Sequence, residues 1–431
     1  MSRQPVETNK EYSAGGWSSH FVLIVCVLLY LINYMDRQVF SVILQPMKLD
    51  LGLTDAQCGL ATTVFIVGMA FFSFPISYMV DRWSRKKSMG IMAILWSGFT
   101  FATGLARSFI GVILPRAFVG LGEAGFAPGG VAMVSASYPE HSRGRALGIF
   151  TIAIPLGAAL GVMLGGLISS KMGWRAPFYY FAIPGVVLGI LAFFMKDYKT
   201  VPIPGASAGL KGFWNAFVEV GRAPTVRWFW PALGLTVFMG QAVLVWLPTL
   251  AIRMLNVNEA GAGLIVGGIG LSAIIGAPLG GFLADMWQKR NPRGRMYVVA
   301  LANIISVFLI IAVVLLRLNT LGIVLGVFYG IFQSMTIPAY AAVTQDIAPV
   351  RHKGLSYGLC IFTQYMFGGA WAPWVIGGVS DALGGGADGL GYAIMLSSIV
   401  GLIGGIFYLL ASRTYPADAE KFKRETVLAE Q

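Results

Sequence analysis

The segment Ser77-Tyr-Met-Val-Asp-Arg-Trp-Ser-Arg-Lys-Lys87 joins two long apolar stretches and carries one acidic and four basic side chains. A similar segment, Gly281-Phe-Leu-Ala-Asp285, also separates two apolar stretches and is followed by basic residues. The acidic residues of the two segments, Asp81 and Asp285, lie 204 positions apart. The sequence therefore predicts two related halves, each with this loop at the corresponding place.

The composition excludes an ordinary soluble enzyme. Of the 431 residues, 56% are hydrophobic and 12% are charged, whereas a soluble domain carries about 25% charged residues. This apolar content exceeds what a single aqueous core would bury, so lipid is the solvent for most of the chain. The net charge of +12 comes from short clusters between apolar stretches. Such scattered clusters argue against nucleic acid as a partner.

Apolar windows of about 20 residues predict an all-α membrane protein with twelve transmembrane helices in two pseudo-symmetric six-helix bundles. The first six helices are expected at 20–44, 56–80, 88–106, 109–136, 146–170 and 177–195. The second six are expected at 229–253, 261–284, 297–316, 322–346, 354–379 and 391–412. The corresponding domains are a tail at 1–19, a bundle at 20–195, a linker with an amphipathic helix at 196–228, a bundle at 229–412 and a tail at 413–431.

The basic residues predict that both termini are cytoplasmic. This orientation places most loop Lys and Arg on one side of the membrane, as the positive-inside rule requires. The chain contains no Asn-x-Ser/Thr acceptor, which together with its short loops favours a bacterial inner membrane. Its three cysteines, Cys26, Cys58 and Cys360, have neither metal-ligand nor disulfide spacing, so neither kind of site is predicted.

Three motifs resemble those of a known family. Asp81-Arg-Trp-Ser-Arg-Lys-Lys87 resembles the loop signature Gly-x-x-x-Asp-Arg-x-Gly-Arg-Arg/Lys of the major facilitator superfamily, although Ser77 and Ser84 replace two of its glycines. Asn33-Tyr-Met-Asp-Arg37 and Arg116-Ala-Phe-Val-Gly-Leu-Gly-Glu-Ala124 resemble the spinster-like branch of that superfamily. Organic-anion/proton symporters share much of this pattern. The resemblance covers the entire chain.

The resemblance implies a secondary active transporter that works by alternating access and needs no cofactor beyond a proton gradient. The implied substrate is lipid-like, a lysophospholipid or sphingoid, or an amphipathic organic anion. A small organic-acid/proton symporter of the anion-cation symporter type is the alternative. A membrane-embedded enzyme is disfavoured because His20, His141 and His352 lie far apart in the sequence. The implied partners are the substrate and membrane lipids, and the implied state is a monomer.

Four ionisable residues, Asp36, Arg37, Arg116 and Glu123, fall well inside expected helices. A charge at the bilayer centre costs roughly 2.5–3.5 kcal/mol on insertion scales, so such groups usually face protein or water and find partners. Positions along the helices predict that Arg116 reaches Asp36 and that Glu123 points into a central cavity. We expect Glu123 and Asp36 to couple protons, and Arg37 and Arg116 to form ion pairs or bind substrate. A static cluster that pins two helices together is the alternative.

A cytoplasmic gate is expected from charged residues at the two matching loops and at the cytoplasmic end of the helix expected at 322–346. These gate residues are Asp81, Arg82, Arg85, Asp285, Asp346 and Arg351. A carboxylate that accepts hydrogen bonds in only one conformation acts as a latch between conformations, and Asp346 is expected to pair with Arg351. The alternative is that these residues are solvated loop and helix-end charges that set topology alone.

The second half offers polar and aromatic side chains without buried charge. The candidates for substrate contact are Gln241, Gln333, Tyr340, Gln364 and Trp371. As a set they predict an amphipathic cavity, whereas for each aromatic residue packing or an interfacial belt is the alternative. Glycines are abundant in 146–170 and 354–379. They permit close helix packing, either static or at an interface that rocks.

Overall fold

The computed structural model describes residues 16–197, 210–349 and 353–430, and in this part of the chain every regular element is a helix. The helices of the first half are α1 (Trp17–Leu51), α2 (Asp55–Arg82), α3 (Arg85–Gly104), α4 (Phe109–Glu123), α5 (Phe126–Ser137), α6 (Glu140–Met172) and α7 (Ala176–Ala192). Local sequence sets several ends: Ser84 and Ser108 cap α3 and α4, and Gly52 closes α1 with a φ of 64°.

A short helix precedes the second half. It is α8 (Leu210–Gly221), and it falls in the linker where the sequence predicts an amphipathic helix. The helices that follow are α9 (Val226–Leu255), α10 (Glu259–Leu271), α11 (Ala273–Arg290), α12 (Gly294–Leu315), α13 (Thr320–Asp346), α14 (Lys353–Gln364), the π-helix η2 (Tyr365–Gly369), α15 (Ala372–Ala382), α16 (Gly386–Ala411) and α17 (Tyr415–Glu430).

Each expected span coincides with one helix or with consecutive helices. The ranges 109–136, 261–284 and 354–379, expected as single helices, are interrupted. The first is broken at Ala124 and Gly125, directly after Glu123, and the last passes through η2. In the described residues nine segments are long and apolar enough to cross a membrane. The count of twelve spans and the cytoplasmic termini remain predictions.

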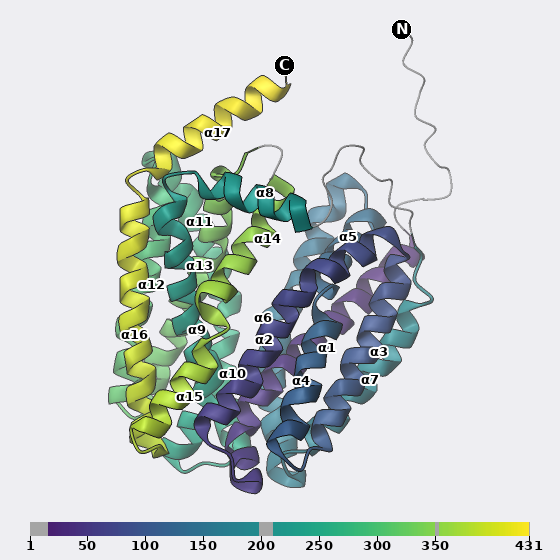
Figure 1. Ribbon diagram of the computed structural model, residues 1–431, viewed down its shortest axis with the longest axis vertical. Helices are drawn as coiled ribbons and strands as arrows, with labels where there is room; N and C mark the ends of the chain where they lie inside the picture. The colour runs from purple at the N-terminus through teal and green to yellow at the C-terminus, as the bar shows by residue number, and fades with distance from the viewer. Residues whose placement is uncertain (1–15, 198–209, 350–352, 431) are drawn as a thin grey trace.

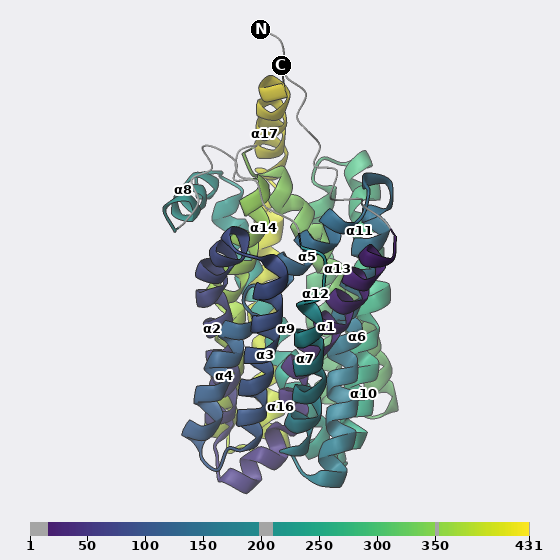
Figure 2. The same ribbon diagram turned by 90° about the vertical axis from the view of Figure 1, so that its right-hand side faces the viewer.

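Figure 1 shows α1–α7 gathered on one side of the molecule and α9–α16 on the other, with the start of α1 and the end of α17, the termini of the described chain, at the same end. Figure 2 shows α8 and α17 at that end as well. The C-terminal tail expected at 413–431 is therefore mostly helical, because Tyr415 and Phe422 on α17 pack into the core of the second half.

The two halves meet near the end opposite the termini, which we call the distal end (Figure 1). One hydrophobic cluster there combines Met47 and Cys58 of the first half with Trp246 and Ile376 of the second. Glycines allow the backbones to touch: a Cβ on Gly59 would lie 2.0 Å from the Pro373 carbonyl oxygen, and one on Gly377 would lie 2.3 Å from the carbonyl oxygen of Asp55. A Cβ on Gly166 of α6 would likewise lie 2.2 Å from the Glu259 carbonyl oxygen, so the helix pairs α2–α15 and α6–α10 close the distal end.

Candidate functional site

A buried ion pair joins α1 and α4 inside the first half. Arg37 Nε donates to Glu123 Oε2 at 2.5 Å, and the Glu123 side chain is 0% exposed whereas that of Arg37 is 15% exposed. Glu123 is the last residue of α4, at the break before α5. The pair therefore lies where the fourth expected span is interrupted. The sequence predicts that Glu123 points into a central cavity. The structure instead shows its carboxylate fully buried and paired with Arg37.

Asp36 and Arg116 are buried beside this pair, but they form no hydrogen bond with each other. Asp36 Oδ2 accepts from Thr100 Oγ1 at 2.5 Å. The guanidinium carbon of Arg116 lies 4.4 Å from the ring centre of Phe40 and 4.6 Å from that of Phe65. Arg116 is thus near the Asp36 carboxylate, as the sequence predicts, but it does not hydrogen-bond to it in this conformation. The position of a residue along a helix predicts its depth in the membrane, but the direction of the Arg116 guanidinium depends on its contacts with the two rings.

The four charged groups nevertheless act on one another. Arg116 interacts electrostatically with both carboxylates, and Asp36 also interacts with Arg37. The three guanidinium nitrogens of Arg116 and one oxygen of each carboxylate have no hydrogen-bond partner within the described part of the chain. These guanidinium donors and carboxylate acceptors are therefore available to hydrogen-bond water or a polar ligand, and the free carboxylate oxygens can accept a proton.

The second half reaches this cluster through Tyr365 on η2. Its side chain lies near Gln241 of α9 and interacts electrostatically with Arg37. Gln241 is among the residues predicted from the sequence, whereas Tyr365 is not, because it lies in an apolar run. π-Helical turns are frequent at functional sites.

The other candidates of the second half lie in different environments. Gln333 and Gln364 are largely buried, and each keeps a side-chain oxygen without a hydrogen-bond partner among the described residues. Tyr340 packs in the hydrophobic core of the second half. Trp371 is 41% exposed and donates from Nε1 to the Met366 carbonyl oxygen. Tyr340 and Trp371 therefore fit the packing and interfacial alternatives.

The expected gate residues are only partly described. The side chains of Asp81 and Arg82, and Arg351 as a whole, lie outside the described part, and Arg85 is buried. In the second half Arg295 binds Asp285 at 2.7 Å and Asp346 at 2.6 Å. Asp346 is thus paired with Arg295, whereas the sequence predicts Arg351 as its partner.

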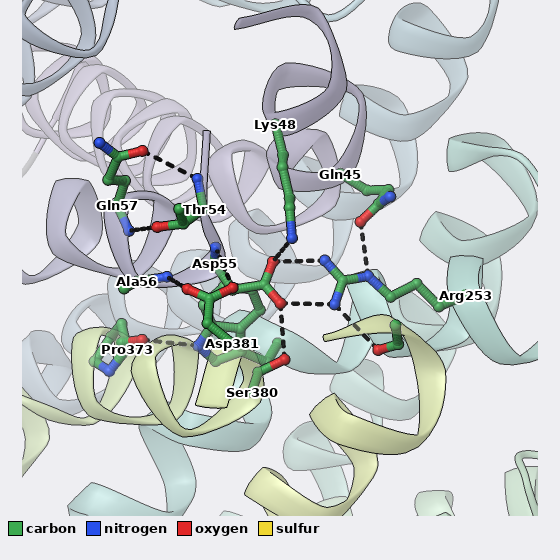
Figure 3. A network of polar contacts seen from close by, with 12 residues as sticks. Gln45, Lys48, Thr54, Asp55, Ala56, Gln57, Arg253, Pro373, Ser380 and Asp381 are labelled. Carbon is green, nitrogen blue, oxygen red and sulfur yellow. Dashed lines mark hydrogen bonds and ion pairs between the residues drawn. The ribbon is translucent and has the colours of Figure 1, made fainter. Parts of the chain in front are cut away.

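A second polar network, which the sequence did not predict, closes the distal end. Figure 3 shows Asp55, at the start of α2, accepting hydrogen bonds from Lys48, Arg253 and Ser380. The shortest of these distances are 2.6 Å from Lys48 Nζ and 2.6 Å from Arg253 Nη2. The Asp55 side chain is fully buried. One carboxylate of the first half therefore gathers donors from both halves.

A reciprocal contact runs the other way. Asp381, at the end of α15, accepts from the backbone N–H of Asp55 at 3.0 Å and of Ala56 at 2.8 Å, so it caps the N-terminus of α2 (Figure 3). Arg253 Nε also donates to Gln45 Oε1 at 2.8 Å. These residues, called the distal network below, are Gln45, Lys48, Asp55, Arg253, Ser380 and Asp381. The network ties α1 and α2 to α9 and α15.

Within the described residues, no group of three or more His, Cys, Asp or Glu could hold a metal ion. The candidate site instead consists of charged side chains inside an apolar helical protein. One buried ion pair lies in the interior, and one network joins the two halves at a single end. Charged groups kept inside a long-helical apolar protein are typical of multi-pass membrane proteins that move ions or substrates.

Comparison with known proteins gives the family. Residues 26–373 match the model of the Major Facilitator Superfamily, and the chain belongs to that family. It is 29% identical to an MFS-type efflux pump of Mycolicibacterium smegmatis, over 91% of this chain and 92% of that protein. It is 25% identical to the sphingosine-1-phosphate transporter SPNS2 of Xenopus tropicalis, over 91% of this chain and 81% of that protein.

A solved structure shares the fold. A bacterial homolog of the human lysosomal transporter Spinster, inward-facing and unoccupied, superposes with a TM-score of 0.83 at 24% identity, over 94% of this chain and 99% of that chain. Proteins named spinster are also among the relatives. The resemblance predicted from the motifs on α1 and α4 is thereby confirmed.

Replacing Arg116 by Lys is expected to slow transport about 5- to 30-fold. Lys keeps the charge but has no planar guanidinium to stack between Phe40 and Phe65, and each such contact is worth roughly 0.5–2 kcal/mol. The measurement is the initial rate of substrate uptake into proteoliposomes. Arg107→Lys, at an exposed position just before α4, is the matched control. A wild-type rate for Arg116→Lys would show that the stacked guanidinium plays no part in transport.

Proposed function

We propose that the protein is a secondary active transporter that uses the proton gradient to move an amphipathic, lipid-like substrate, a lysophospholipid or sphingoid, or an amphipathic organic anion. The observation that carries this proposal is the buried Arg37–Glu123 pair at the α4–α5 break. A buried ion pair contributes little net stability, because desolvation offsets the Coulomb attraction. A carboxylate kept at this position is therefore best explained by a step that protonates it.

The coupling step follows from the geometry. A proton on Glu123 removes the negative charge that holds Arg37, and the guanidinium becomes free to bind an anionic head group. Tyr365 of the second half interacts electrostatically with Arg37, and Gln241 lies near Tyr365. Binding of the head group there would draw the two halves together around it. Asp36, held by Thr100, is the second proposed coupling residue.

Alternating access is proposed to use the distal network as the gate on one side. The structure has the distal end closed, as in an inward-facing transporter, and opening it requires the bonds between Asp55 and Arg253 to break. The proposed setting is a bacterial inner membrane with cytoplasmic termini, and the proposed state is a monomer. The proposal includes no enzymatic step and no cofactor, since the gradient supplies the energy.

A binding screen tests the substrate class. Purified protein is titrated with lysophospholipids, sphingoid lipids and small organic acids, and labelled hits are then assayed for uptake into proteoliposomes with and without a pH gradient. The proposal expects saturable binding of an amphipathic compound and uptake that collapses with the gradient. Binding of small organic acids alone would favour the small organic-acid/proton symporter instead. An uptake rate that is the same with and without the pH gradient would overturn proton coupling.

The cytoplasmic latch remains a proposal with its own test. Asp81→Ala is expected to raise the inward-facing fraction at least about 5-fold, since coupling energies of this kind begin near 1 kcal/mol. Gly148 on α6 has open space beside it, so Gly148→Cys can report access from the side of the termini by thiol labelling. Asp285→Ala serves as the comparison and should have a smaller effect. Equal labelling at position 148 in the Gly148→Cys protein alone and in its combinations with Asp81→Ala and with Asp285→Ala would mean that these loop charges set topology alone.

A further inference from the structure

A groove of about 420 Å³ lies outside the charged cluster, between α8, the start of α9, η2 and α16. Its walls are mostly apolar and include Trp230, Leu235, Phe367 and Phe407, while Arg227 lies in the lining as its charged residue. The volume falls in the range of small-molecule sites, about 300–1,000 Å³. The groove lies on the side of the molecule that carries the termini, where α8 is seen in Figure 2.

The groove is built by close backbone contact and by aromatic docking. Gly234 of α9 and Gly368 of η2 touch so closely that a Cβ on Gly368 would lie 1.9 Å from the Gly234 carbonyl oxygen. Beside this contact the ring of Phe367 is 56% exposed. At the other end, Phe217 of α8 stacks on Trp230 with ring centres 4.6 Å apart. Rigid contacts thus fix both ends of the hollow.

The position of α8 sets the depth of the groove in a membrane. This helix is amphipathic, and its Trp214 and Val218 are exposed beside the docked face. A helix of this kind lies in the interface between head groups and acyl chains. The adjacent Arg227 is exposed and forms no hydrogen bond or ion pair with the described residues; its guanidinium lies only near the Trp228 ring, at 5.8 Å. Arg227 therefore lies at the level of the lipid head groups, next to the apolar groove, without a hydrogen-bond or ion-pair partner among the described residues.

We propose that this groove is a binding site for an anionic phospholipid of the surrounding leaflet. The phosphate is bound by Arg227, whose planar fork of donors matches phosphate oxygens. One acyl chain lies against Trp230, Leu235 and Phe367. A zwitterionic lipid would bind more weakly, because a juxtamembrane arginine favours an anionic lipid surface by about 1 kcal/mol.

The site would communicate with the charged cluster through η2. Phe367 lines the groove, while Tyr365, two residues earlier on the same π-helical turn, interacts electrostatically with Arg37. Lipid packed against Phe367 therefore steadies the turn that presents Tyr365. This lipid stays bound in the groove and is not the transported substrate. The inference rests on membrane insertion and on the groove, and it does not require proton coupling.

The test measures lipid binding directly. Detergent-purified protein is mixed with phosphatidylglycerol or phosphatidylcholine of identical acyl chains, and bound lipid is counted by native mass spectrometry and by thermal shift. Wild type is expected to retain phosphatidylglycerol in preference to phosphatidylcholine. Arg227→Gln should weaken phosphatidylglycerol binding by about 5-fold or more, since a juxtamembrane arginine is worth about 1 kcal/mol. Leu235→Trp, which fills the hollow, should weaken it as well.

The matched control is Arg290→Gln. Arg290 is an exposed arginine at the end of α11, outside the groove, so its loss changes net charge equally but should leave lipid binding unchanged. Equal weakening by Arg227→Gln and Arg290→Gln would overturn the site in favour of general surface charge. Undiminished phosphatidylglycerol binding by Leu235→Trp would overturn the placement of the acyl chain. Equal retention of the two lipids by wild type would overturn the phosphate contact.

Discussion

Glu123→Gln protein is expected to lose proton-driven uptake completely while it still binds substrate and exchanges it across the membrane. Glutamine resembles the protonated acid and cannot release a proton, so the carrier no longer couples its cycle to the gradient. The measurement compares uptake driven by a pH gradient with exchange of labelled for unlabelled substrate in the same proteoliposomes. Full proton-driven uptake by this variant would exclude Glu123 as the coupling residue.

Stability must be separated from coupling in that experiment, because removal of one partner from a buried pair costs roughly 3–5 kcal/mol. A double variant, Arg37→Gln with Glu123→Gln, removes both charges and should recover thermal stability without recovering proton-driven uptake. Glu140→Gln, at an exposed position in the first turn of α6, is the control for expression and labelling. Recovery of uptake in the double variant would show that the pair is structural.

Asp55→Asn protein is expected to open at the distal end. The substitution leaves Lys48 and Arg253 facing each other without their shared carboxylate, and only the closed conformation buries them together. A loss of roughly 3–5 kcal/mol in that conformation raises the fraction open at the distal end about 100-fold or more. Native Cys58, one turn further along α2 and 1% exposed, can report the opening by reaction with an impermeant maleimide.

The controls use residues already in the chain. Cys58→Ser identifies the labelled position, since Cys26 and Cys360 are buried elsewhere. Asp388→Asn removes an acid that pairs with Arg317 at 2.7 Å, where both side chains are more than half exposed. Exposed pairs of this type contribute about 0–1 kcal/mol, so this variant should label like wild type. Slow labelling of Asp55→Asn, equal to that of Asp388→Asn, would show that the distal network is not a gate.

The helices could be predicted closely because long apolar runs encode them directly. The interruptions could not be, because the chain stays apolar across Ala124-Gly125 and across Tyr365–Gly369. These breaks depend on how backbones approach one another, as where Gly368 meets Gly234. A hydropathy window averages over such local geometry.

The buried charges could also be identified from sequence, since an ionisable residue inside an apolar run is conspicuous. Their partners could not, because the rotation of each helix about its axis decides whether Arg37 or Arg116 faces Glu123. The distal network was missed for a different reason. Lys48, Asp55, Arg253 and Asp381 lie at helix ends in four separate segments, where a charged residue is usually solvated. Only the folded arrangement brings them together.

The distal network has an electrical consequence. The first half contributes one cation and one anion, Lys48 and Asp55, and the second half contributes Arg253 and Asp381. Each side of the gate is therefore neutral, and its opening separates no net charge. Moving one elementary charge across a membrane potential of 100 mV changes its energy by about 2.3 kcal/mol. Because no net charge moves when this network opens, the membrane potential should change the opening equilibrium very little. Under the proposed mechanism, any voltage dependence of transport would then arise where a proton or a charged substrate moves past the Arg37–Glu123 pair.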